Sequence, residues 1–144
     1  MMSSERNVNV FAALILVLSI IGIILLATQY FASLYTGTYY YHSCLDCENA
    51  TAGDLFAQIV MIIFLVVQIV IAINDLLPKR FIQKDLDKFG LLFAVTTVLL
   101  AIIGLASFGI YWDAYDWWPD TGFYGGIIAG ILNTILFFLK WRNK

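Results

Sequence analysis

Charged residues are scarce in this chain, and none lies within its four long apolar runs, residues 10–30, 55–74, 89–111 and 123–139. Only 12% of the residues are charged and 62% are hydrophobic, whereas about a quarter of a soluble domain is charged. Proton relays and ion pathways require ionisable residues at membrane depth. Their absence argues against a proton-coupled transporter, and a passive channel would need several copies of the chain to line a pore.

Histidine and cysteine are also scarce. His42 is the only histidine, and haem, copper or di-iron centres need several such ligands. We therefore expect no metal and no cofactor. The two cysteines, Cys44 and Cys47, lie in one connection between apolar runs, where the reactive side chains of the chain are crowded together.

Each apolar run is close to the ~20 residues that a helix needs to cross a bilayer. All eight Lys and Arg lie before the first run, between the second and third, or after the fourth. The connections at residues 31–54 and 112–122 contain neither. If the helices alternate in direction, the basic segments share one side, which the positive-inside rule makes cytoplasmic. The sequence thus predicts an all-α, four-transmembrane-helix bundle with both termini in the cytoplasm.

The distribution of acidic residues agrees with this topology. Four acidic residues accompany the eight basic ones on the cytoplasmic side, giving +4, and six acidic residues on the outer side give −6, which together match the net charge of −2. We expect one four-span domain over residues 1–144, in a multi-pass protein of the cell membrane. The first run could instead be a cleaved signal peptide, but it exceeds the ~7–15 residues of such a core and has no Ala-x-Ala site.

Small residues recur along one face of the fourth run. Helices in lipid associate through close packing, so small side chains mark their contact faces. We predict that this stripe packs within the bundle, with Asn133 near the seam; the alternative is a face reserved for a partner protein or a second copy. The stripe consists of Gly122, Gly126, Gly130 and Thr134.

Three interpretations of Cys44 and Cys47 are open. The first is a structural disulfide, within the chain or between chains, because the connection faces an oxidising compartment. The second is a redox-active Cys-x-x-Cys pair, although the neighbouring Asp46 and Glu48 disfavour a thiolate. The third is a zinc site with His42 and an acid, for which the tight spacing gives poor tetrahedral geometry.

The same connection contains Asn49-Ala50-Thr51, which satisfies the glycosylation sequon on the side where glycans are attached. Either Asn49 carries a glycan or the triplet occurs by chance. A glycan at this position would hinder a redox partner from reaching Cys47.

Three of the four Trp residues lie in the second outer connection. Amphipathic aromatic rings at the headgroup level anchor spans, and this is the interpretation we favour. Alternatively, aromatic rings interleaved with carboxylates recognise a cation, a sugar or a partner loop. The residues concerned are Trp112, Trp117, Trp118, Asp113 and Asp116.

The cytoplasmic connection at residues 76–88 alternates apolar and basic side chains. Pro78 marks the end of the second span. We favour a plain connecting turn; the alternative is a short helix lying on an anionic leaflet.

Four spans with both ends inside, a larger first outer connection with two cysteines, a shorter aromatic second one and a Gly-rich fourth span resemble the claudin and peripheral-myelin-protein tetraspans. The local similarities are Tyr111-Trp112 and residues 123–130, Phe-Tyr-Gly-Gly-Ile-Ile-Ala-Gly. The first connection lacks the family's Trp and Gly-Leu-Trp motif, and its cysteines are close together rather than well apart. The resemblance implies a structural role in adhesion or beside another membrane protein, with Cys44 and Cys47 as a disulfide. The short connection leaves little room for the family's extracellular sheet.

The segment Cys44-Leu45-Asp46-Cys47 also resembles the motif of DsbB-type, quinone-linked disulfide generators, which have four spans and a Cys-x-x-Cys in the first outer loop. Those enzymes use a second cysteine pair and an Arg near the quinone, and residues 112–122 contain neither.

We therefore expect a membrane protein without chemistry of its own, acting through helix and loop contacts as a structural protein or an accessory subunit of a larger membrane assembly. Its expected partners are the lipid bilayer and other membrane subunits or further copies of the chain, with no nucleic acid. The alternative is a membrane thiol-disulfide oxidoreductase that uses Cys44 and Cys47.

Overall fold

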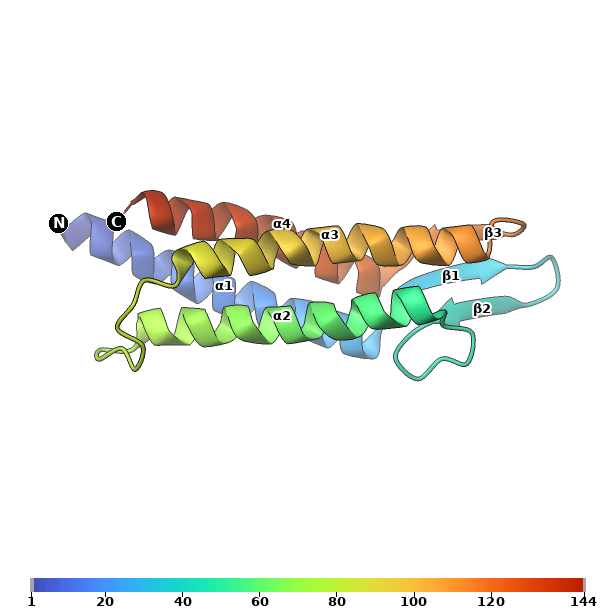
Figure 1. Ribbon diagram of the computed structural model, residues 1–144. Helices are drawn as coiled ribbons and strands as arrows, with labels where there is room; N and C mark the ends of the chain where they lie inside the picture. Colours follow the sequence, from blue (N-terminus) through green and yellow to red (C-terminus); the bar gives the residue numbers. More distant parts are fainter. Residues whose placement is uncertain (1, 144) are drawn as a thin grey trace.

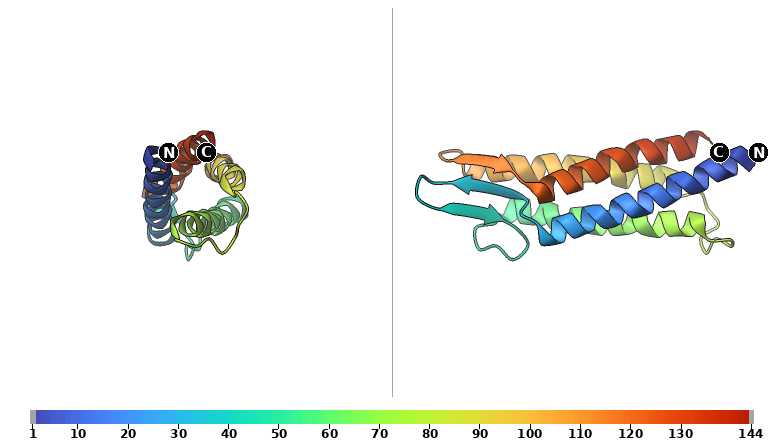
Figure 2. Two further views of the ribbon diagram at one scale, coloured as in Figure 1. Left: turned by 90° about the vertical axis from the view of Figure 1, so that its left-hand side faces the viewer. Right: turned by 180° about the vertical axis from the view of Figure 1, so that it is seen from behind.

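In the computed structural model, which describes residues 2–143, four long helices run side by side in alternating directions (Figure 1). They are α1 (Met2–Thr28), α2 (Ala52–Leu76), α3 (Asp87–Tyr111) and α4 (Thr121–Arg142). Each is long and apolar enough to cross a membrane. The prediction of four helices is therefore confirmed. The start of α1 and the end of α4 lie together at one end of the bundle, here called the terminal end (Figure 2).

A small antiparallel sheet covers the opposite end, here called the sheet end, so the prediction of a purely α fold is wrong there. Strands β1 (Ala32–Tyr35) and β2 (Tyr40–Ser43) come from the connection between α1 and α2. The connection between α3 and α4 supplies β3 (Asp116–Pro119), and the strand order is β2-β1-β3. A sheet forms despite the short first connection because the second connection contributes a strand to it.

The ends of α2, α3 and α4 lie within about three residues of the predicted runs, whereas α1 begins earlier and ends at Thr28 rather than Tyr30. Two backbone hydrogen bonds of 2.8 Å, from Gly122 N to Tyr30 O and from Phe31 N to Ser43 O, draw the chain out of the helix towards β1. Residues 77–86 contain no helix, so that connection is a turn and the surface-helix alternative is wrong.

The outward surfaces of the helices are apolar, and their polar side chains lie inside. Val17, Ile63 and Ile103 are among the exposed large apolar residues. Each helix packs against its sequence neighbours, and α4 closes the ring against α1. This distribution is the reverse of that in a soluble bundle and suits surroundings of lipid.

One polar side chain from each helix contributes to a layer inside the bundle. Asn133 Nδ2 of α4 donates to Ser19 Oγ of α1 at 2.8 Å and to Gln68 Oε1 of α2 at 2.7 Å. Gln68 Nε2 donates to Thr97 Oγ1 of α3 at 3.1 Å. All of these residues are fully buried. The layer therefore links the four helices in one relative register.

Glycines of α4 allow close approach of the neighbouring helices. A Cβ added at Gly126 would lie 2.3 Å from Met61 Cε, and one at Gly130 would lie 2.9 Å from Val98 Cγ2. Thr134, the last member of the predicted stripe, donates to the Gly130 carbonyl of its own helix at 2.7 Å. The two glycines therefore contact the interior of the bundle, whereas Thr134 is half-buried.

A buried group of charges lies at the terminal end. Lys140 Nζ contacts the carboxylate of Asp75 on α2 and lies 2.8 Å from Asp87 Oδ1 on α3. Arg80, in the turn after α2, pairs with Asp75 at 3.2 Å. Lys140 and Asp87 are fully buried. Lys140 is thus a bridging residue among three helices and not only a basic residue that follows the last span.

Replacement of Lys140 by Met should lower the free energy of unfolding by about 3–5 kcal/mol, because two buried carboxylates lose the cation that they share. Titration of the protein in dodecyl maltoside with sodium dodecyl sulfate measures this change. Arg142→Met is the matched control, since Arg142 is exposed. Equal effects of the two substitutions would contradict a buried ion pair.

Replacement of Asn133 by Leu should destabilise the bundle by about 0.6–2 kcal/mol, the range for hydrogen bonds between helices in membranes. Thr134→Val is the control, because the Thr134 hydroxyl bonds to its own helix. The same detergent titration compares the two variants. If Thr134→Val cost as much as Asn133→Leu, the interhelical layer would not contribute to stability.

Candidate functional site

The β1–β2 hairpin projects beyond the helix ends (Figures 1 and 2). Thr36 N donates to Tyr39 O at 3.1 Å across the turn. Gly37 has a φ of 90°, a backbone conformation that glycine adopts without the steric cost of a side chain. On the other edge of β1, β3 pairs with Leu34 opposite Trp117. The two connections at the sheet end therefore form one body.

Alternation along the strands gives the sheet an apolar face towards the helices. Ala32 and Leu34 are fully buried. Trp117 packs against Phe108 of α3, with 6.5 Å between the ring centroids. A Cβ added at Gly109 would lie 2.3 Å from Trp117 Cζ2, so the absence of a side chain at Gly109 makes room for the indole.

The opposite face of the sheet carries aromatic rings that are partly or largely exposed. The Tyr35 and Tyr40 ring centroids are 4.6 Å apart, and those of Tyr40 and Trp118 are 6.3 Å apart. Tyr40 is 63% exposed and Trp118 is 37% exposed. Asp116, opposite Tyr35 in the register, adds a carboxylate. We call Tyr35, Tyr40, Asp116 and Trp118 the aromatic face.

A hydrogen-bonded chain crosses the sheet beside the aromatic face. Ser33 Oγ donates to Asp120 Oδ2 at 2.7 Å and lies 2.7 Å from His42 Nδ1. A hydroxyl has one proton, so His42 Nδ1 must donate to Ser33. The His42 ring stacks on Tyr30, with 3.9 Å between centroids and 6° between planes.

These residues do not form a catalytic triad. In a triad the histidine lies between the carboxylate and the serine and removes the serine proton. Here Ser33 lies in the middle and donates its proton to Asp120, and Ser33 is fully buried. This series of hydrogen bonds therefore joins β2, β1 and the start of α4 and does not activate a nucleophile.

Asp120 also connects the sheet to α4 through the backbone. Its Oδ1 accepts from Thr121 N at 2.8 Å, and its own N–H donates to Phe31 O at 3.0 Å. Gly122, predicted as a helix-packing residue, lies where α4 begins against the chain entering β1. A Cβ at Gly122 would lie 2.9 Å from Tyr30 O, so the helix approaches this closely only with glycine there.

A second buried junction joins β2 to α2. Asp54 accepts hydrogen bonds from Ser43 Oγ and, at 2.8 Å, from Thr51 N. Gln58 Nε2 donates to Ser43 Oγ at 3.1 Å. Ser43, Asp54 and Gln58 are fully buried. Asp54, which the sequence places among the acidic residues of this end, is therefore not part of the surface.

Cys44 and Cys47 form a disulfide within the chain, as the first interpretation predicted. Their Cα atoms are 4.9 Å apart, and Cys47 N donates to Cys44 O at 3.2 Å. The bond closes one turn and does not join separate elements of structure. Because both sulfurs are bonded to each other, neither is a thiolate that could bind zinc with His42.

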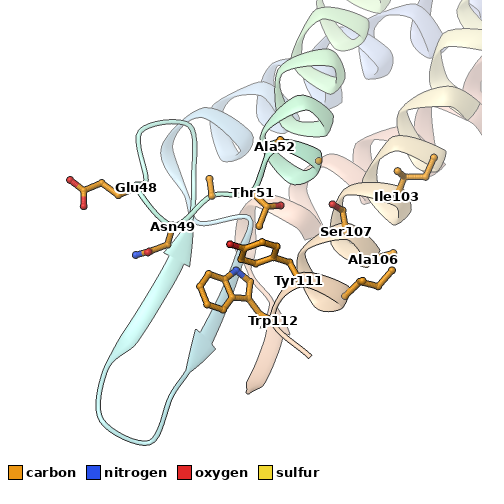
Figure 3. Close-up of a pocket in the computed structure, with 12 residues that line it drawn as sticks. Glu48, Asn49, Thr51, Ala52, Ile103, Ala106, Ser107, Tyr111 and Trp112 are labelled. Carbon is orange, nitrogen blue, oxygen red and sulfur yellow. The ribbon is translucent and has the colours of Figure 1, made fainter. Parts of the chain in front are cut away.

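A cavity of about 870 Å³ opens between the loop before α2 and the last turns of α3 (Figure 3). Ile103 and Ser107 line it from α3, and Asn49 lines it from the loop. Tyr111 and Trp112 lie together at its sheet end, while the Glu48 side chain points away from it. Asn49, the asparagine of the glycosylation sequon, is half-buried beside this cavity.

The five recognition candidates of the second connection lie in different surroundings. Trp117 packs against α3, whereas Trp118 and Asp116 belong to the aromatic face. Trp112 lines the cavity, and Asp113 is exposed. The sequence pattern therefore indicates an aromatic region but does not separate its packing residues from its surface residues.

Sequence reasoning does not find the contact between Ser33 and Asp120, which are 87 positions apart. The only local signal is that Asp120 precedes an apolar run, as N-cap residues do. From the sequence, His42 could be considered only as a metal ligand, because its partner Ser33 belongs to a strand that the sequence does not indicate.

Comparison of the chain with protein-family models, with curated proteins and with solved structures finds no match.

Replacement of both Cys44 and Cys47 by Ser should lower the free energy of unfolding by at most about 2 kcal/mol, because the bond closes a very short loop. Thermal unfolding in detergent, with and without dithiothreitol, measures this. The reductant should affect the parent protein and leave the variant unchanged. Collapse of the whole fold in the variant would show that the bond does more than close its own turn.

Proposed function

We propose that the chain is a non-enzymatic membrane protein, a structural or accessory subunit of a larger assembly in the cell membrane. Both termini lie in the cytoplasm, and the sheet lies outside. The bundle holds the sheet in place, and the aromatic face of the sheet binds a neighbouring membrane protein. This is a scaffold or adhesion role of the kind that the resemblance to claudin-type tetraspans implies.

The aromatic face is the observation that carries this proposal. Tyr and Trp supply large contact areas with little loss of conformational freedom, and they are enriched among the residues that dominate binding energies. Tyr40 and Trp118 are exposed side by side on strands that several buried hydrogen bonds attach to the helices. A rigid, exposed aromatic surface of this type favours protein recognition over membrane anchoring alone.

The interior of the spans supports a role without chemistry. The polar side chains of the central layer bond to one another, and Lys140 is paired with two carboxylates. A transport pathway would need polar groups that face a continuous route through the bundle. In the described part of the chain, the polar side chains bond to one another between helices and hold the helices together.

The proposal predicts a partner that is lost when the aromatic face is removed. The intact protein, purified in a mild detergent, should retain other membrane subunits in stoichiometric amounts by mass spectrometry. Tyr40→Ala with Trp118→Ala should lose them. The control is Phe138→Ala with Trp141→Ala, an exposed aromatic pair with 6.1 Å between centroids at the terminal end, which should keep them.

Two results would contradict the proposal. The first is purification of the protein alone from its native membrane, which would show that it has no stable partner subunit. A partner that is retained as well without the aromatic face as with the control substitutions binds elsewhere.

A separate test addresses the assigned sides of the membrane. A cysteine placed at Asn7, at the terminal end, is treated with membrane-impermeant thiol reagents, and its labelling shows on which side that end lies.

The alternative is a thiol-disulfide oxidoreductase resembling the DsbB type. The observation that favours it is the closed Cys-x-x-Cys bond between Cys44 and Cys47 in a surface turn. These are the only two cysteines, so electrons would have to reach a quinone without a second pair in this chain. Bound quinone in the purified protein, with a pair that cycles between thiol and disulfide, would favour this function.

A further inference from the structure

The cavity at the sheet end has the size of a ligand site. Its volume is about 870 Å³, and small-molecule sites usually measure roughly 300–1,000 Å³. Small residues line it on both sides, Ala52 and Gly53 from α2 and Ala106 and Ser107 from α3. A Cβ at Gly53 would lie 2.0 Å from Ser107 Oγ, so the two helices already touch there. The walls of the cavity are therefore positioned by a contact between α2 and α3 and not by the loop alone.

The lining changes from apolar to polar along α3. Ile103 and Ile110 are 59% and 76% exposed. Trp112 lies nine residues beyond Ile103, or roughly 14 Å at the rise of an α-helix. A lipid that lay along this wall would pass from its acyl chains through its ester groups to its headgroup over a comparable distance.

Trp112 supplies a hydrogen-bond donor at the polar end of this wall. Its Nε1 atom is buried and has no hydrogen-bond partner among the described residues. The Tyr111 ring lies at 4.9 Å and 76° to the indole, on the side of its nitrogen (Figure 3). A ring face is a weak acceptor. Tyr111 is 66% exposed and can rotate away to admit a better one.

The chemistry of these walls selects the ligand. The ester carbonyl and phosphate oxygens of a phospholipid only accept hydrogen bonds, and an indole N–H only donates. The connections at residues 31–54 and 112–122 contain several carboxylates and no Lys or Arg. Net negative headgroups and free phosphate are therefore repelled, whereas a zwitterionic headgroup is not.

We propose that this cavity binds one zwitterionic phospholipid from the leaflet at the sheet end. Its acyl chain lies along Ile103 and Ile110, and one of its ester or phosphate oxygens accepts the hydrogen bond from Trp112 Nε1. This proposal rests on the bilayer-spanning arrangement. It does not depend on the accessory role, so either can fail without the other.

The test uses the full chain in nanodiscs that contain phosphatidylcholine with a photoreactive diazirine on its acyl chain. After irradiation, mass spectrometry should find the label concentrated between Ile103 and Trp112. The comparison region is the apolar groove between α1 and α4, lined in part by Leu14 and Leu132, which ordinary surrounding lipid also contacts.

Two substitutions probe the site. Ala106→Phe fills the cavity from an exposed position and should reduce labelling to the level of the groove, whereas Leu99→Phe, also exposed on α3, should not. Trp112→Phe keeps an aromatic ring of smaller size but removes the N–H donor, and it should weaken retention of phosphatidylcholine by about twofold to tenfold. Trp141→Phe, at the terminal end, is its control.

Competition identifies the headgroup. Unlabelled phosphatidylcholine should displace the probe, and neither phosphatidylglycerol nor inorganic phosphate should do so. Equal labelling of the cavity and the groove would overturn the proposed site. Unchanged labelling in Ala106→Phe and Trp112→Phe would also overturn it. Equal displacement by phosphatidylglycerol would overturn the choice of a zwitterionic ligand.

Discussion

Polar groups between apolar helices have no water to bond, so each must find its partner inside the bundle. The Asn133 Nδ2 atom meets this requirement by donating to Ser19 and Gln68, on two other helices. Lys140 does so by lying between Asp75 and Asp87. The same requirement applies in the central polar layer and at the terminal end. In both places the polar contacts connect different helices, and they fix a relative register that apolar packing alone does not specify. Glycines such as Gly126 then bring the helices close enough for these bonds to form.

The sheet end follows a related rule, because its backbone groups also need partners. β1 lies between β2 and β3, and the carbonyls of Tyr30 and Phe31 accept hydrogen bonds from the start of α4. Through β1, two connections that are far apart in the sequence become one surface. The inward side of that surface rests on Phe108 and Gly109, and the outward side carries the aromatic face. The position of the exposed rings is thus a consequence of how the sheet is attached.

The helices could be predicted because each apolar run has about the length of a helix that crosses a bilayer, and charges mark where α2, α3 and α4 end. The disulfide could be predicted because Cys44 had no partner other than Cys47. The sheet could not, since strands of four residues carry too little alternation and the pairing of β1 with β3 joins distant segments. The burial of Lys140 also escaped prediction, because a single sequence shows its charge but not the side of α4 that faces Asp87.

Asp120 has two simultaneous roles, since one carboxylate oxygen caps the first turn of α4 and the other holds Ser33 of β1. Separation of the hairpin from this carboxylate would therefore also loosen the start of α4. Proteins open locally in cooperative units, and this shared residue places the sheet and the first turn of α4 in the same unit. A pull on the hairpin would thus act directly on α4, one of the helices that are long and apolar enough to cross a membrane.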